Sequence, residues 1–252
     1  MAAGAYRGGM PSAPPRSSAL ARLIARPFAH RGLHGAGIPE NSRAAFAAAI
    51  AAGWGIELDV QASADGEAMV FHDAELGRLA EAEGQLADFA AAELARFRLE
   101  GSDETIPTLA EALALIGGRT PLLIELKAPG RRVAALSGAV ERALAGYCGP
   151  VAAMSFNPEV GRWFAAQAPA RLRGLVVTEA GKSWRGIAAR RLALRRARPD
   201  FLAYDIRDLP SRFAAAMRGR GLPVLTWTCR GVADRAKARK HADQIIFEGP
   251  PR

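Results

Sequence analysis

Short apolar runs alternate along the chain with longer segments whose apolar residues recur at helical spacing. The helical segments include 42–52, in which Phe46 and Ile50 are four residues apart, and 108–116. Nearly continuous apolar strands that alternate with helices are typical of a parallel sheet covered by helices. The strand candidates are residues 26–30, 55–61, 68–72, 121–127, 150–155, 171–177, 201–204, 222–228 and 244–247.

The length of 252 residues suits one (β/α)₈ TIM barrel, an α/β fold. Nine strand candidates for eight barrel strands mean that one is misassigned or lies outside the barrel. Residues 74–104 follow the third candidate, contain no clear strand and are too long for an ordinary loop. They predict a short helical insertion over one end of the barrel. Residues 1–25, rich in Ala, Gly, Ser and Pro, predict a flexible arm or a leading helix before a barrel domain at 26–252.

The chain carries a formal charge of +9, which favours anionic partners such as phosphorylated metabolites, membranes or nucleic acids. Most of this charge is arginine scattered along the chain, and a GC-rich genome produces the same Ala and Arg richness without any function. Cys148 and Cys229 form neither a disulfide framework nor a zinc motif. No segment resembles a signal peptide or a membrane span, so we expect a cytoplasmic protein.

The segment 182–198 concentrates basic residues without an acidic one. Its seven basic residues are Lys182, Arg185, Arg190, Arg191, Arg195, Arg196 and Arg198. Apolar residues lie among them, and a basic amphipathic helix can rest on an anionic membrane. A solvated outer helix of the barrel is the alternative. The segment has a single aromatic residue, Trp184, and not the series of interleaved aromatics that a base-stacking surface requires, so we expect no nucleic-acid partner.

Charged side chains stand where four successive strand candidates end. These residues are His30 and Arg31 in the first, Glu57 and Asp59 in the second, His72 in the third, and Glu125 and Lys127 in the fourth. In a (β/α) barrel, the C-terminal strand ends converge on one mouth. Residues two apart on a strand point to the same face, so Glu57 and Asp59 are expected to point together.

The residue types in this set suit phosphoryl chemistry. Three carboxylates form a hard oxygen site of the kind that binds Mg²⁺ or Ca²⁺. Two histidines can act as general base and general acid across a phosphate, while Arg31 and Lys127 offset its negative charge. A layer of salt bridges would explain any pair of these residues, but not all of them on four consecutive strands.

The ordered motifs resemble those of the glycerophosphodiester phosphodiesterase family. They are H-R-G at 30–32, P-E-N-S at 39–42, Phe46, E-L-D-V at 57–60, D-G at 65–66, F-H-D at 71–73, I-P-T-L at 106–109, E-L-K at 125–127, S-F at 155–156 and W-T at 227–228. The resemblance spans nearly all of residues 26–249. It implies hydrolysis of a small-molecule glycerophosphodiester to glycerol 3-phosphate and an alcohol.

The resemblance also implies a role for individual residues. Glu57, Asp59 and Glu125 would hold a divalent cation, Mg²⁺ or Ca²⁺, and His30 and His72 would be the acid–base pair. The substrate-binding residues would be Arg31 and Lys127 at the phosphate, Glu40 behind them or at the substrate, and Phe156 and Trp227 at the glycerol or leaving group. Phe156 and Trp227 could equally be ordinary core aromatics.

Three departures from the family pattern leave the choice of substrate open. Leu79-Ala80 replaces the usual threonines, Cys229-Arg230 stands where an Asn is common, and Phe247-Glu248 replaces a Thr-Asp pair. One alternative function is a lysophospholipase D-like phosphodiesterase that acts on lysophospholipids at a membrane surface. Another is a catalytically inactive barrel that binds phosphodiesters, although the retained histidines and carboxylates argue against it.

Overall fold

Eight parallel strands form a closed barrel in the computed structural model, which describes residues 16–179 and 184–249. The strands are β1 (Phe28–Ala29), β2 (Gly55–Ala62), β4 (Leu122–Leu126), β5 (Val151–Ser155), β6 (Leu172–Val177), β7 (Phe201–Asp205), β8 (Val224–Cys229) and β9 (Gln244–Phe247). Strand β1 pairs with both β2 and β9, which closes the sheet. The predicted α/β barrel is therefore confirmed.

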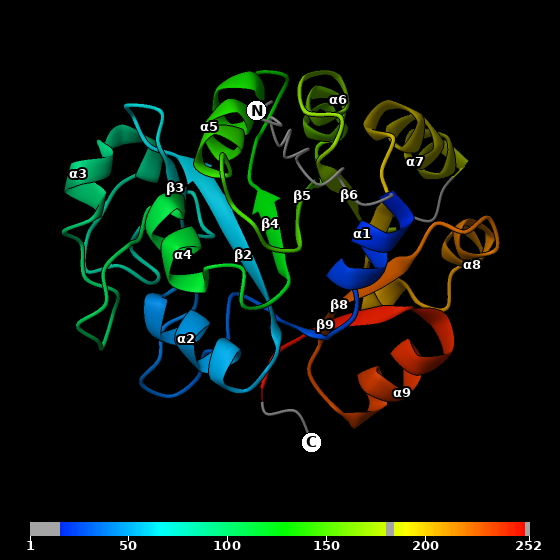
Figure 1. The fold of residues 1–252 in the computed structure, drawn as a ribbon, viewed down its shortest axis with the longest axis horizontal. Coiled ribbons are helices and arrows are strands. Elements are labelled where there is room, and N and C mark those ends of the chain that lie inside the picture. The colour runs from blue at the N-terminus through cyan, green and yellow to red at the C-terminus, as the bar shows by residue number, and fades with distance from the viewer. Residues whose placement is uncertain (1–15, 180–183, 250–252) are drawn as a thin grey trace, which may run out of the picture.

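Helices surround the barrel and bury their apolar faces against the strands (Figure 1). They are α2 (Arg43–Ala51), α4 (Leu109–Ile116), α5 (Ala134–Ala143), α6 (Pro158–Gln167), α7 (Trp184–Ala197), α8 (Arg212–Arg218) and α9 (Val232–His241). Helix α4 illustrates the local signals. Thr108 and Glu111 form a capping box at its start, and its apolar residues Leu109, Leu113 and Ile116 are buried. None of the described helices has the length and apolar character needed to cross a membrane.

The strand candidate 68–72 is not a barrel strand. Strand β3 (Ala68–Val70) runs antiparallel to β2, with Val60 opposite Val70. Strand β2 continues beyond the barrel, and the chain reverses at Gly66, whose φ of 84° is readily adopted only by glycine. The amide of Phe71 donates to the carbonyl of Asp59 at 3.1 Å. The hairpin therefore brings His72 back to the barrel mouth, whereas we had expected His72 to end the third parallel barrel strand.

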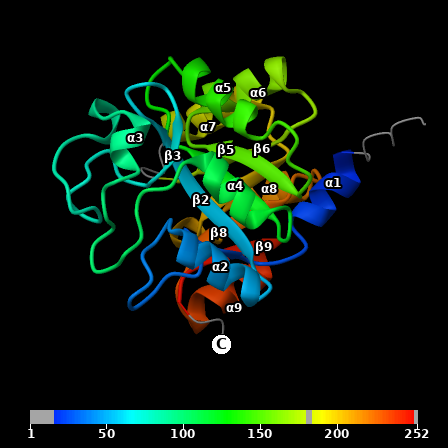
Figure 2. The ribbon, with the colours of Figure 1, turned by 60° about the vertical axis from the view of Figure 1, so that its left-hand side comes forward.

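The insertion after this hairpin is present, but it is helical only in two short turns. These are η1 (Leu86–Asp88) and α3 (Ala91–Leu94), and isolated bridges such as Ala80 with Leu99 link the remaining chain. It packs around its own apolar cluster, which includes Phe71, Leu76, Leu86, Leu94 and Leu99. Figure 2 shows the insertion and α1 on opposite sides of the barrel.

Helix α1 (Arg16–Leu23) covers the N-terminal opening of the barrel. Leu23 is fully buried and packs with residues at the strand starts, such as Phe28 and Phe201. Arg16 forms an ion pair with Asp200. Residues 16–23 thus form the leading helix and not the flexible arm, because the spacing of apolar residues gives α1 a face that closes the barrel interior. Residues 1–15 lie outside the described residues, and 26–252 stays our proposed domain.

Leu23→Ala should lower the free energy of unfolding by about 2–5 kcal/mol, because it leaves a cavity under α1. Leu192→Ala, at a position that is 60% exposed, should change it by no more than about 0.5 kcal/mol. Denaturant titration of both variants gives the comparison. Equal stability of Leu23→Ala and wild type would mean that α1 does not cover the barrel in solution.

Candidate active site

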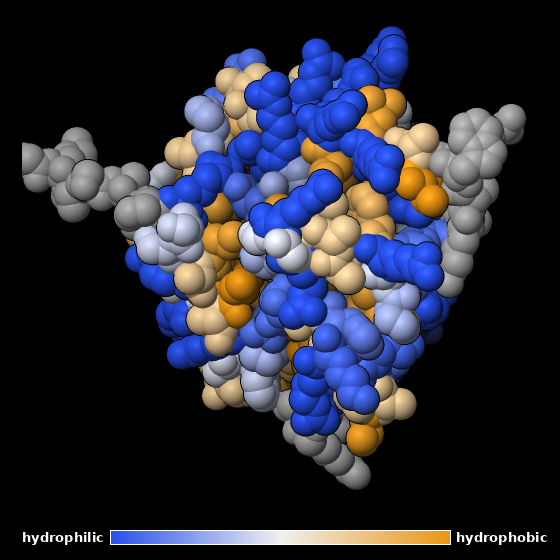
Figure 3. Space-filling model, turned by 90° about the vertical axis from the view of Figure 1, so that its right-hand side faces the viewer, coloured by the Kyte–Doolittle hydropathy of each residue, from blue (hydrophilic) through white to orange (hydrophobic). Residues whose placement is uncertain are grey.

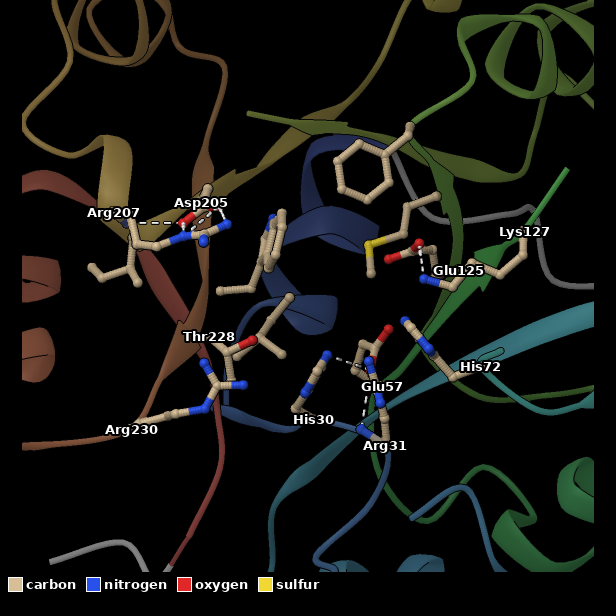
Figure 4. A pocket seen from close by; sticks show the side chains of 15 residues that line it. His30, Arg31, Glu57, His72, Glu125, Lys127, Asp205, Arg207, Thr228 and Arg230 are labelled. Carbon is tan, nitrogen blue, oxygen red and sulfur yellow. Dashed lines mark hydrogen bonds and ion pairs between the residues drawn. The ribbon is translucent and has the colours of Figure 1, made fainter. Parts of the chain in front are cut away.

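The predicted residues meet in a hollow of about 430 Å³ at the C-terminal mouth of the barrel (Figure 4). Of the predicted site residues, its wall contains His30, Arg31, Glu57, His72, Glu125, Lys127, Phe156 and Trp227. Asp59 lies beside Glu57 and Glu125, and Glu40 lies behind Arg31, off the cavity wall. The strand ends therefore place every predicted residue in the cavity or directly against it.

Three buried carboxylates form the floor of the site. One oxygen each of Glu57, Asp59 and Glu125 lies within 4.8 Å of the others. The register of the sheet produces this cluster, because Asp59 on β2 lies opposite Glu125 on β4 and Glu57 is two residues away on the same face. Burial and the charge of Asp59 raise the pKa of Glu57 to about 8, and burial also raises the pKa of Glu125.

This donor set fits a divalent cation. Oxygen Oε1 of Glu57 is buried and has no hydrogen-bond partner among the described residues. Three carboxylates so close together repel one another, and a hard cation bound by oxygen atoms removes that repulsion. Mg²⁺ and Ca²⁺ both prefer such ligands.

Two cations of the chain face the cluster. Nζ of Lys127 lies 3.0 Å from Asp59 Oδ1 and also pairs with Glu125. Nε of Arg31 lies 3.3 Å from Asp59 Oδ2, and its Nη1 donates to Glu40 at 2.8 Å. Burial alone would raise the pKa of Asp59, but Lys127 and Arg31 outweigh it and lower the pKa to about 2. Asp59 therefore stays a carboxylate at neutral pH.

Asn41 orients Asp59, a role that we did not predict. Its Nδ2 donates to Asp59 Oδ2 at 3.0 Å, and its Oδ1 accepts from the amide of Asp59 at 3.2 Å. Ser42, the next residue, caps α2 instead. Asn41 belongs to the P-E-N-S motif, so the sequence marked it as a candidate. The sequence alone does not show that this loop residue contacts Asp59, 18 positions later on a strand.

Each of the two histidines in the cavity, His30 and His72, has one ring nitrogen in contact with a carboxylate. Nδ1 of His30 lies 2.6 Å from Oε1 of Glu248, and Nδ1 of His72 lies 2.6 Å from Oδ1 of Asp73. Burial opposes protonation of His30, but the charges of Glu57 and Glu248 outweigh it and raise its pKa. Burial lowers the pKa of His72. Glu248 was noted only as a departure from the family pattern, so its contact with His30 was also missed.

Aromatic and apolar side chains complete the wall of the hollow. Phe156 and Trp227 meet edge to face, with ring centroids 5.6 Å apart, and Phe156 is 44% exposed. Met154, Ile206 and Ile246 line the same hollow. Phe156 and Trp227 are therefore placed to touch a bound molecule, and Phe156 is not an ordinary core aromatic.

A sequence model of the glycerophosphoryl diester phosphodiesterase family matches residues 30–246. The chain belongs to this family. The matched range contains both histidines and all three carboxylates of the cluster. The match also extends over the barrel strands from β2 to β8.

Two family relatives align with part of the chain. A glycerophosphodiester phosphodiesterase of Bacillus altitudinis is 40% identical over 107 residues, which are 40% of this chain and 43% of the relative. One of Caldanaerobacter subterraneus subsp. tengcongensis is 41% identical over 108 residues, 40% of this chain and 44% of the relative. The aligned stretch thus spans less than half of either relative.

Solved structures of family proteins match most of the chain. A phosphodiesterase of Oleispira antarctica, solved with the product sn-glycerol-3-phosphate, superimposes with a TM-score of 0.79 at 26% identity, covering 91% of this chain and 94% of that one. A glycerophosphodiester phosphodiesterase of Thermotoga maritima gives 0.71 at 25% identity, covering 87% and 92%. Both likenesses extend over the barrel as a whole.

Saturating Mg²⁺ or Ca²⁺ should raise the thermal midpoint. A cation at 100 times its Kd stabilises the folded chain by about 2.7 kcal/mol, or roughly 5–10 °C for a chain of this size. Asp59→Asn should abolish most of this metal-induced rise in the thermal midpoint. The rise is measured within each variant, because removal of one repelling carboxylate can itself stabilise Asp59→Asn without metal. Asp103→Asn, at an exposed position in the insertion, should keep the rise. An equal rise in both variants would place the cation elsewhere.

Proposed function

We propose that the chain hydrolyses glycerophosphodiesters to glycerol 3-phosphate and an alcohol. The observation that carries this proposal is that His30 and His72 share one cavity with the three-carboxylate cluster. A divalent cation held by Glu57, Asp59 and Glu125 would offset negative charge on the phosphate. The family membership and the product bound in the Oleispira antarctica structure support the same reaction.

The side chains of the mouth have distinct tasks in this reaction. Lys127 and Arg31 bind phosphate oxygens, which are negatively charged throughout. One histidine takes a proton from the nucleophile, either water or the 2-hydroxyl of the glycerol, as its oxygen bonds to phosphorus. The other gives a proton to the alcohol oxygen as its bond to phosphorus breaks. Attack by water gives glycerol 3-phosphate directly, and attack by the 2-hydroxyl gives a cyclic phosphate that water then opens. Phe156 and Trp227 contact the glycerol or the departing alcohol.

Glycerophosphocholine and glycerophosphoethanolamine, each with Mg²⁺ or Ca²⁺, should release glycerol 3-phosphate, and EDTA should stop the release. His72→Ala should lower the rate by about 10²- to 10⁴-fold, because it removes one proton-transfer group. His241→Ala, on α9 and outside the cavity, is the control and should behave as wild type. Failure of wild type to release glycerol 3-phosphate with either ion would contradict the proposed function.

The outer surface beside the mouth favours a second candidate, hydrolysis of lysophospholipids at a membrane. A hollow of about 950 Å³ lies between α7 and α8. Its lining includes Arg190, Arg191, Arg195, Arg212 and Arg220 together with the apolar residues Ile187, Leu194, Phe213 and Met217. Leu192 on α7 is 60% exposed. Figure 3 shows this side of the molecule, where hydrophilic side chains surround hydrophobic patches.

Arginines around apolar side chains suit the phosphate heads and acyl chains of an anionic membrane. The predicted membrane segment 182–198 coincides with α7, although Lys182 and Ser183 lie outside the described residues. The cytoplasmic location and the absence of a nucleic-acid partner stay predictions.

Vesicles that contain phosphatidylserine should sediment the protein at low salt. The double variant Arg191→Glu/Arg195→Glu should lose this binding, and Arg239→Glu/Lys240→Glu, with the same change of charge on α9, should keep it. Faster hydrolysis of lysophosphatidylcholine than of glycerophosphocholine would favour the lipid substrate. If wild type does not sediment with these vesicles, the proposed membrane contact is wrong.

A further inference from the structure

We propose that Glu248 is a positioning residue for His30, and that Arg230 holds Glu248 in place. Glu248 would fix which ring nitrogen of His30 carries hydrogen and which way the ring faces. The inference rests on the proposed acid–base role of His30 and adds two residues that the family motifs quoted above do not contain.

The closure of the barrel brings Glu248 to His30. Glu248 directly follows β9, which pairs with β1, and the amide of His30 donates to the carbonyl of Phe247 at 2.9 Å. The amide of Glu248 donates to the carbonyl of Cys229 at 3.1 Å, which fixes its backbone. The two side chains are thus neighbours although 218 positions separate them.

The contact with Glu248 determines which tautomer the imidazole of His30 adopts. A carboxylate only accepts hydrogen bonds, so Nδ1 of His30, 2.6 Å from Glu248, is the nitrogen that carries hydrogen. Nε2 then faces the other way, 3.9 Å from Oε2 of Glu57. A neutral ring held in this way presents a lone pair at Nε2, toward the carboxylate cluster where the phosphate would lie.

Arg230 in turn holds the carboxylate of Glu248. Its Nε donates to Oε2 at 2.7 Å and its Nη2 donates to Oε1 at 3.2 Å. Such a two-point pair fixes the plane of a carboxylate as well as its distance. Figure 4 shows Arg230 beside Thr228, on the same side of the hollow as His30.

The other histidine has the same arrangement, built from a different part of the chain. Nδ1 of His72 contacts Asp73, and Asp73 is held by Arg78. His72 thus has its neighbour in the sequence as its carboxylate, and His30 has a residue from the opposite end of the chain. Two independent His–carboxylate–Arg sets at one mouth indicate that both rings must be oriented.

The test measures kcat and KM for glycerophosphocholine with the divalent cation present. Glu248→Gln should lower kcat by about 10- to 100-fold with KM within about 2-fold, the range typical for loss of a group that orients a functional histidine. Glu248→Asp should recover part of kcat, because it restores a carboxylate. Glu141→Gln removes a comparable two-point carboxylate–arginine pair, with Arg171, away from the site and should leave kcat unchanged.

A second measurement does not require turnover. In ¹⁵N-histidine spectra at a pH where the ring is neutral, His30 of wild type should show hydrogen on Nδ1, and Glu248→Ala should show a mixture of tautomers. Unchanged ring signals in Glu248→Ala would overturn the proposal, whatever happens to kcat. Wild type that is inactive but shows the fixed tautomer would instead contradict the proposed function and leave the positioning role standing.

Discussion

Burial of three carboxylates at one end of a barrel is the constraint on which the rest of the mouth depends. Glu57, Asp59 and Glu125 are nearly inaccessible to water, and each would be costly to bury as an unpaired charge. Lys127 and Arg31 offset part of the charge, and one oxygen of Glu57 is left without a hydrogen-bond partner among the described residues. A bound divalent cation would complete a site built in this way and would explain why the chain tolerates the cluster.

The groups around the cluster are ordered by further pairs. Asn41 binds Asp59 through both its side-chain atoms, Glu40 holds Arg31, and Glu248 and Asp73 hold the two histidines. Most of these residues stand on loops, so fixed strands alone do not position them. These hydrogen bonds and ion pairs provide the orientation that the proposed proton transfer and phosphate binding would require. The mouth is therefore a connected polar network on a rigid apolar barrel.

The periodicity of apolar residues predicted the barrel. The position of charged residues at the strand ends correctly predicted that the main site residues lie close together. Glu57 and Asp59 share a face because alternation along a strand is a local property. The role of β3 was not predictable in this way, because an apolar run of three residues looks the same in a hairpin and in a barrel. The contact of Glu248 with His30 depends on the pairing of β9 with β1, which the local sequence does not encode. Composition alone did not decide between a flexible arm and a leading helix before the barrel, because the burial of Leu23 depends on the folded barrel that it closes.

The most direct test of the account is a crystal structure of the protein grown with Mn²⁺ and sn-glycerol 3-phosphate, with the ion located by anomalous scattering. The account predicts one ion within coordinating distance of Glu57, Asp59 and Glu125, with the phosphate group on it and between the rings of His30 and His72. A mouth in which Lys127 keeps its ion pairs and no ion lies among the three carboxylates would contradict it.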